Sequence, residues 1–246
     1  MAGRRRTRVP LVVFINGRRV GELRRDAGGA VDFRYDPEWL GWEGTFPVSL
    51  SLPLREDRYV GAPVVAVFEN LLPDNEEIRR RLAARMRAEG IDAFSLLAAI
   101  GRDCVGALQF IPADEPAPAL SAIAGAPLAD AQIANLLANL GTAPLGVDPE
   151  RSFRISLAGA QEKTALLWWK GKWHRPLGTT PTTHILKPPI GRLPNGLDLS
   201  ASVENEFLCM KLAAAAGLPA ADVSIARFGG IRALVIARFD RRAARG

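Results

Sequence analysis

The sequence predicts a mixed α/β (α+β) chain in two parts, and three observations lead to this prediction. Two β-rich runs flank the dipeptide Asn16-Gly17, a turn signal typical of a hairpin. Helical and strand-like segments then alternate as far as a connection over residues 144–150. After this connection come three strand-like runs, one helix and two more strand-like runs. We therefore expect a boundary near residue 145, which divides the chain into 1–145 and 146–246.

The first part combines strand and helix patterns. Residues 47–54 alternate apolar and hydroxyl side chains, as a half-buried strand does. In the first part as a whole we expect a hairpin over 9–24, strands over 31–35, 47–54 and 105–111, and helices over 73–89, 92–100 and 130–140.

The second part has a simple element order. We expect strands over 153–157, 164–170, 182–187, 221–228 and 232–237, with a helix that opens at Ser202 and ends at Gly217. The apolar stripe of this helix is expected to comprise Val203, Phe207, Leu208, Leu212 and Ala215. Three strands, a helix and two strands is also the order of a protein-kinase small lobe.

Composition excludes several classes of protein. With 48% hydrophobic and 24% charged residues, the chain is typical of a folded domain rather than a disordered one. No apolar run reaches the roughly 18 residues of a membrane span, and the stretch after the basic start is too short for a signal peptide. Two cysteines outside any CxxC pair and two histidines predict no metal site. We expect a cytoplasmic protein without membrane contact.

Net charge is +6, and four arginines lie within the first eight residues. Such an arm is commonly a solvated tail. It can also contact an anionic surface, because clustered arginine supplies affinity that does not depend on sequence.

Two segments suggest phosphate chemistry. The loop around Gly159 consists of small residues, and such a loop can bring backbone N–H groups close to phosphates, although most such loops are only turns. Lys187 ends an apolar strand 19 residues before Glu206, which lies on the following helix. In kinases a strand lysine binds the α/β-phosphates and pairs with a glutamate of the next helix. The alternatives are a snorkelling surface lysine and a solvent-facing glutamate.

A third segment is the apolar strand that runs into Arg238-Phe239-Asp240. It is either a hinge strand beside an adenine or a buried edge strand with a charged end.

Seven stretches together resemble the HipA family of serine/threonine kinase toxins over nearly the whole chain. They are residues 16–22 (NGRRVGE), 47–53 (PVSLSLP), 69–74 (ENLLPD), 100–107 (IGRDCVGA), 155–165 (ISLAGAQEKTA), 182–187 (TTHILK) and 238–241 (RFDR). The stretches at 155–165 and 238–241 are the most specific of these.

The resemblance implies a toxin of a type II toxin–antitoxin system, linked to growth arrest and persistence. HipA-type proteins use ATP and Mg²⁺ to phosphorylate a protein substrate, a glutamyl-tRNA synthetase in the best-known case. A small HipB-like antitoxin with a helix-turn-helix fold holds and represses them, and it brings them indirectly to DNA. By this resemblance, residues 1–145 form a partner-binding subdomain and residues 146–246 a kinase small lobe.

The resemblance also implies roles for single residues. The phosphate loop matches residues 158–163, the ATP lysine matches Lys187 with Glu206 in support, and the hinge matches residues 237–239. The implied nucleotide-binding residues are Ala158, Gly159, Ala160, Gln161, Glu162, Lys163, Lys187, Ala237, Arg238 and Phe239. Ser156 matches a serine that the family autophosphorylates, which expels the loop and switches the kinase off.

Two departures qualify this reading. The family hinge usually reads Glu-Arg-Phe-Asp-Arg, whereas here Ala237 replaces the glutamate, so a side-chain contact is expected to be lost. No stretch supplies the catalytic Asp, or the Asn and Asp that hold magnesium. We therefore expect a fragment that lacks the large helical lobe, is inactive alone and binds ATP weakly. The alternatives are a binding module for the antitoxin or a separate catalytic chain, and a degenerate remnant.

Overall fold

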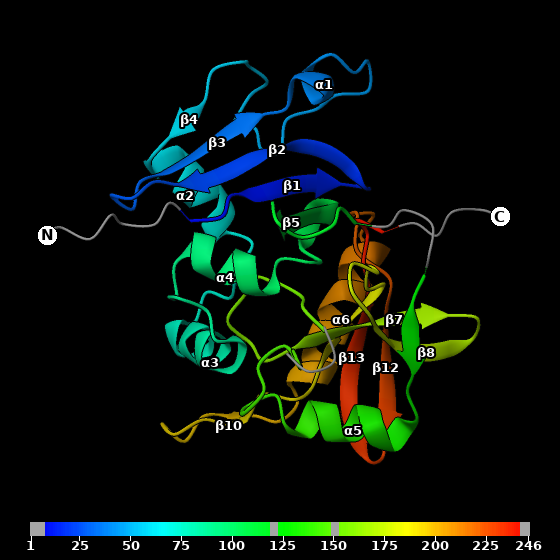
Figure 1. Ribbon diagram of the computed structural model, residues 1–246. Helices are drawn as coiled ribbons and strands as arrows, with labels where there is room; N and C mark the ends of the chain where they lie inside the picture. The colour runs from blue at the N-terminus through cyan, green and yellow to red at the C-terminus, as the bar shows by residue number, and fades with distance from the viewer. Residues whose placement is uncertain (1–7, 119–122, 149–152, 242–246) are drawn as a thin grey trace, which may run out of the picture. The chain divides into compact units, whose positions relative to one another are not determined.

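The chain forms two compact units. The computed structural model describes residues 8–118, 123–148 and 153–241, and it has the mixed α/β character that the sequence predicts (Figure 1). The first unit comprises residues 1–122 with 154–159, and the second comprises 123–153 with 160–246.

This division differs from the boundary expected near residue 145. The helix at 130–138 packs on the sheet of the second unit, so that unit begins before the helix. Residues 154–159 return to the first unit, where the amide of Ser156 donates to the carbonyl of Asp103. The expected connection at 144–150 is described only as far as residue 148. The roles assigned to the two parts remain predictions.

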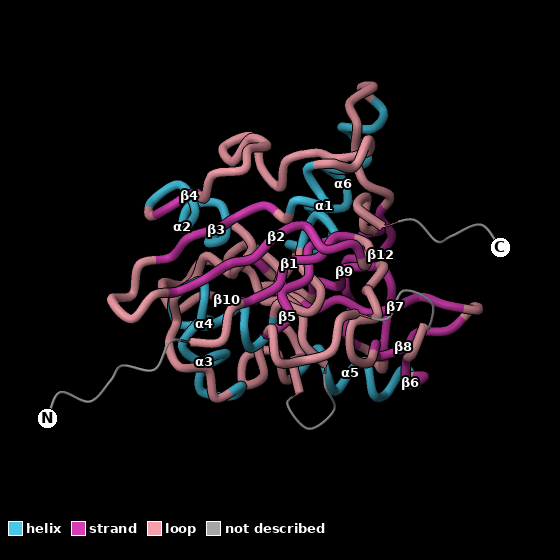
Figure 2. Tube along the Cα trace, turned by 45° about the horizontal axis from the view of Figure 1, so that its top comes forward, coloured by secondary structure: helices cyan, strands magenta, loops and turns pink. Residues whose placement is uncertain are grey.

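The first unit is built on an antiparallel sheet in the order β4-β3-β2-β1-β5. Its elements are β1 (Leu11–Ile15), β2 (Arg18–Arg25), β3 (Val31–Tyr35), α1 (Pro37–Leu40), β4 (Tyr59–Val60), α2 (Ala62–Glu69), α3 (Glu76–Met86), α4 (Ala93–Ile100), the 3₁₀ turn η1 (Val105–Ala107) and β5 (Leu108–Pro112). The predicted hairpin is confirmed: Asn16 and Gly17 both have positive φ, as a tight β1–β2 turn requires. Figure 2 shows β1, β2 and β3 side by side.

The strand predicted over residues 47–54 is wrong. This segment contains one isolated bridge, between Ser49 and Leu52, and is otherwise loop. The buried hydroxyl of Tyr35 fixes the loop instead, since it donates to the Leu52 carbonyl at 2.5 Å and accepts from the Val48 amide at 3.0 Å. Alternation fails here because Leu50 is exposed while Leu52 is buried.

The helix predicted over residues 73–89 is shorter in the structure. Asn75 caps α3 through its side chain, which accepts from the amides of Glu77 and Ile78. The helix ends at Met86, and the C-cap residue Arg87 has a positive φ. The helix predicted over residues 92–100 is confirmed as α4, with Asp92 as its N-cap.

The second unit contains a six-stranded sheet in the order β12-β13-β9-β7-β8-β6. Its elements are β6 (Gly125–Pro127), α5 (Asp130–Ala138), β7 (Thr164–Trp169), β8 (Lys172–Pro176), β9 (His184–Lys187), β10 (Gly191–Arg192), β11 (Asp198–Leu199), α6 (Ser202–Ala215), β12 (Val223–Phe228) and β13 (Ile231–Ala237). The predicted strands at 164–170, 182–187, 221–228 and 232–237 are therefore found, with small shifts of their ends. The strand predicted over 153–157 is not formed, because only Phe153 makes a bridge, to Asp148.

Each face of the second sheet carries one helix. On the α5 face, Leu136 of α5 packs in one cluster with Leu186 and Val235. On the α6 face, Val203 of α6 packs with Leu234. Successive side chains of each strand point to these two faces in turn, as in any pleated strand.

The apolar stripe predicted for α6 is only partly correct. Val203, Phe207 and Met210 pack toward the sheet, at positions i, i+4 and i+7. Leu208 and Leu212 belong to another side of the helix, and their exposed fractions are 56% and 59%.

No described helix combines the length and the apolar character that crossing a membrane requires.

Candidate functional site

The second unit holds a lysine–glutamate pair at the position that the sequence predicts. Lys187 is the last residue of β9, and its Nζ lies 2.6 Å from Oε1 and 2.9 Å from Oε2 of Glu206 on α6. Both side chains are only partly exposed. The carboxylate therefore holds the ammonium group on the α6 face, and the interpretation of these residues as unconnected surface groups does not apply.

Strand pairing places the apolar surroundings of Lys187. Residues directly opposite each other in antiparallel strands share a face, and Lys187 lies opposite Leu234. The next pair on the same face is Ile185 and Ile236. Lys187 thus stands at the edge of an apolar surface, a setting that suits a planar ring next to a phosphate group.

The small-residue loop leads into this region. Gly159 has a φ of 101°, which L side chains rarely adopt, so this position requires glycine. Gln161 donates from Nε2 to the carbonyl of Pro188 at 3.0 Å, which ties the loop to the residue after Lys187. Ala160 is exposed, Glu162 is half-buried and Lys163 is buried. Ala158 and Gly159 still belong to the first unit.

The three residues of the expected hinge, 237–239, lie in different environments. Ala237 lies opposite His184 and therefore on the α5 face, away from Lys187. A side chain at position 237 points away from the Lys187 face, whichever residue stands there. We expected Ala237 to lose a side-chain contact that the family's glutamate makes. Such a contact would not lie on the Lys187 face. Phe239 is 87% exposed.

Arg238 is a buried structural residue. Its Nε and Nη2 lie 3.1 and 2.9 Å from the two carboxylate oxygens of Asp240, and its Nη1 donates to Thr182 Oγ1 at 2.8 Å. Only 2% of its side chain is exposed. The guanidinium group fixes the end of β13, so any nucleotide contact at position 238 has to come from the main chain.

Sequence reasoning missed Thr182 and Asp240. The i, i+2 spacing of arginine and aspartate in the stretch RFDR was the available signal for Asp240. No local pattern points to Thr182, 56 residues away from Arg238.

Ser156 is fully buried in the first unit. Its Oγ donates to the carbonyl of Leu71 at 2.7 Å, and its amide donates to the carbonyl of Asp103 at 3.0 Å. The hydroxyl is therefore inaccessible to a phosphate donor until the segment at 154–159 opens.

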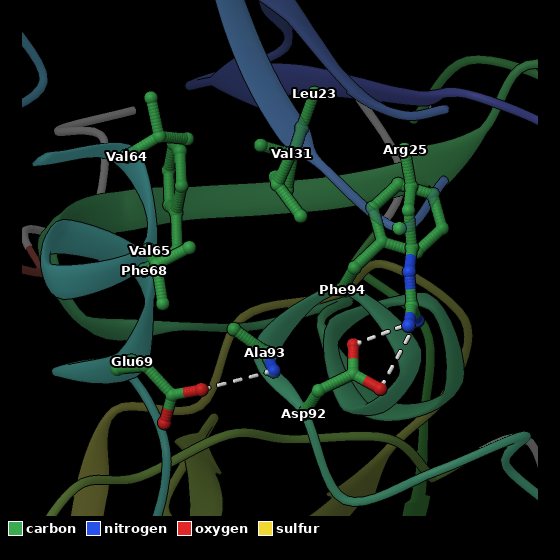
Figure 3. Close-up of a pocket in the computed structure, with 11 residues that line it drawn as sticks. Leu23, Arg25, Val31, Val64, Val65, Phe68, Glu69, Asp92, Ala93 and Phe94 are labelled. Carbon is green, nitrogen blue, oxygen red and sulfur yellow. Dashed lines mark hydrogen bonds and ion pairs between the residues drawn. The ribbon is translucent and has the colours of Figure 1, made fainter. Parts of the chain in front are cut away.

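The first unit also encloses a small pocket of about 150 Å³ (Figure 3). Arg25 points at Asp92 across it, with 3.1 Å between Nη1 and each carboxylate oxygen. Glu69 accepts from the Ala93 amide at 3.1 Å and pairs with Arg79. These charged groups therefore pair with other groups of the first unit. Glu69, the first residue of the stretch ENLLPD, links α2 to α3 and α4.

The chain is similar to known proteins over almost its whole length. Family models described as the HipA N-terminal domain and the HipA-like C-terminal domain match residues 11–111 and 155–246. The chain is 40% identical over 235 residues to "Putative kinase Y4mE" of Sinorhizobium fredii. This match covers 94% of this chain and 54% of that protein. It is 29% identical over 224 residues to the serine/threonine-protein kinase toxin HipA of Shewanella oneidensis, with 91% and 48% covered.

A solved complex of HipA, HipB and operator DNA from Shewanella oneidensis MR-1 shows the same fold. The TM-score is 0.71 at 28% identity, and the match covers 96% of this chain and 52% of that one. The chain thus spans about half the length of the relatives that it matches. With both family models matched in order and the fold shared, the chain belongs to the HipA family.

Proposed function

We propose that this chain carries the nucleotide-side half of a HipA-type serine/threonine kinase toxin of a type II toxin–antitoxin system. The ion pair between Lys187 and Glu206 carries this proposal, because a kinase small lobe needs this lysine held by this glutamate. In this role Lys187 binds the α/β-phosphates of ATP, and the main chain of the loop at 158–163 surrounds them. The main chain at 237–239 meets the adenine.

The residues fit ATP better than they fit magnesium. The loop has a glycine at positive φ, and its Gln161 is hydrogen-bonded to Pro188, the residue after Lys187, which suits phosphate. Among residues 8–118, 123–148 and 153–241, no group of three or more His, Cys, Asp or Glu side chains could hold a metal ion. We therefore assign no Mg²⁺ ligands among the described residues, and we expect weak ATP binding and no phosphate transfer by this chain alone.

An ATP titration followed by backbone amide NMR tests the site. We expect shifts at residues 159–163 and at Lys187 only at ATP concentrations above the micromolar range. The shifts should be lost in Lys187→Met and retained in Lys211→Met, a matched change of an exposed lysine on α6. Shifts that Lys187→Met leaves unaltered would exclude the proposed phosphate site.

A second candidate function is partner binding by the first unit. The similarity to the HipA N-terminal domain and to a HipA–HipB–DNA complex supports a HipB-like antitoxin as partner, with DNA reached through it. A cytoplasmic location, a role in persistence, a glutamyl-tRNA synthetase substrate and control through Ser156 belong to the same proposal.

Co-expression with a HipB-like antitoxin tests partner binding. The folded chain should co-purify with the antitoxin, and Lys187→Met should co-purify equally well, because the proposed partner surface does not include the nucleotide site. A folded chain that fails to retain the antitoxin contradicts this function.

A further inference from the structure

We infer that the α5 face of the second sheet carries a separate binding site for a cationic side chain, an arginine or lysine, presented by a protein partner. The site is a pocket of about 270 Å³ lined by Trp168, Trp173, His184, Asp222, Ser224 and Ala237, among others. This inference does not depend on the proposed kinase function.

The pocket lies on the face opposite Lys187. Ala237 and Leu166 both lie opposite His184, so the three share the α5 face. Trp168 lies opposite Trp173 two residues further along β7. A ligand in this pocket therefore occupies the other side of the sheet from a nucleotide held by Lys187.

Aromatic rings form one wall of the pocket. The centroids of Trp168 and Trp173 are 4.8 Å apart in an edge-to-face arrangement, and Trp173 lies 5.2 Å from the ring of His184. Trp168 is 44% exposed, so its indole surface is available to a ligand. Tryptophan is the best aromatic partner for a cation, and arginine stacks on such a surface.

The charge of the pocket is negative. Asp222 supplies a carboxylate directly before β12, whereas burial lowers the pKa of the His184 imidazole and favours its neutral form at pH 7. The described lining includes no lysine or arginine. Indole rings beside a carboxylate favour a cation and disfavour a phosphate.

Size and position indicate a single side chain from a polypeptide. The volume is slightly below the roughly 300–1,000 Å³ of pockets that take drug-sized ligands, which favours a single side chain over a nucleotide. Asp222 and Ser224 lie at the edge of the described sheet, where β12 is the last strand. An extended partner segment can run along such an edge and place one side chain over the sheet face.

The test uses the whole chain with tryptophan indoles labelled by ¹⁵N. The probe is the blocked peptide acetyl-Gly-Arg-Gly-amide, and its control replaces arginine with the neutral isostere citrulline. We expect the arginine peptide to shift the indole signals of Trp168 and Trp173 with a dissociation constant in about the millimolar range. Trp39 and Trp42, which belong to the first unit, should not respond.

Two variants and a matched control decide the chemistry. Asp222→Asn should weaken the arginine peptide about two- to fivefold, Trp168→Ala should weaken it at least as much, and Asp57→Asn, an exposed aspartate of the first unit, should have no effect. An unchanged far-ultraviolet circular dichroism spectrum verifies that each variant folds.

Several results would overturn the inference. They are equal affinity for the citrulline peptide, no effect of Asp222→Asn, responses confined to Trp39 and Trp42, or no shift up to about 20 mM peptide. Tighter binding of AMP than of the arginine peptide at the same indoles would mean that the pocket takes a nucleotide instead.

Discussion

Adding a negative charge at Ser156 should open one segment of the first unit. In the native state the Ser156 hydroxyl is fully buried and donates to the Leu71 carbonyl at 2.7 Å. Ser156→Ala removes the donor and leaves a buried carbonyl without it, which costs about 1–3 kcal/mol. Ser156→Asp should cost more, because a buried unpaired carboxylate adds a desolvation penalty of several kcal/mol.

Amide hydrogen exchange measures this effect directly. The Ser156 amide donates to Asp103, so its exchange reports opening of the segment at 154–159. A change of about 2 kcal/mol corresponds to roughly a 30-fold faster exchange at equilibrium opening, since about 1.4 kcal/mol is tenfold. Ser51→Ala, at an exposed serine of the same unit, should leave that rate unaltered.

Exchange of the residue-156 amide in Ser156→Asp as slow as in the wild type would contradict this prediction. That result would mean that the segment accommodates a negative charge without opening, and that burial does not protect Ser156 from phosphorylation.

Four further predictions concern stability and chemistry. The chain with labelled ATP and Mg²⁺ should transfer no phosphate to itself or to a glutamyl-tRNA synthetase, and transfer abolished by Lys187→Ala would contradict this. Intact mass after expression in a host without a HipA-type kinase should show no phosphate on Ser156. Arg238→Ala should destabilise the second unit by about 3 kcal/mol or more in urea unfolding, because it removes the two charged hydrogen bonds to Asp240 and leaves that carboxylate largely buried; an effect below about 1 kcal/mol would refute this role of Arg238. Burial raises the pKa of Tyr35 to about 12, and the hydrogen bond from Val48 opposes this shift. The protonated phenol therefore contributes its full stabilisation of the fold below about pH 10, and this stabilisation is lost as the pH rises through about 12. The difference in unfolding free energy between wild type and Tyr35→Phe should shrink over that range, and a constant difference would be evidence against it.

Local patterns predicted the strands and helices whose signals are contained within a few residues. The Asn16-Gly17 hairpin and the Asp92 cap are of this kind, because positive φ and capping are decided by neighbours in sequence. The pair of Lys187 and Glu206 also followed from sequence, through spacing and a family resemblance.

Contacts distant in sequence were beyond such reasoning. Residues 47–54 alternate like a strand, but the hydroxyl of Tyr35 supplies their hydrogen bonds from another element. The burial of Arg238 depends on Thr182, and the α6 stripe depends on which side of the helix meets the sheet. Local sequence does not identify these partners, and no sequence motif marks the pocket beside Asp222.

The return of residues 154–159 to the first unit has a consequence for synthesis of the protein. Residue 159 is made 37 positions after residue 122, so the first unit acquires its last segment only after the whole of α5 has been synthesised. At about 5–20 residues per second, this delay lasts roughly 2–7 s. During this interval the carbonyl of Leu71 lacks its serine, 85 residues downstream. A nascent chain stalled before residue 154 should therefore be cleaved by proteases more readily within its first 122 residues than one stalled well beyond residue 159.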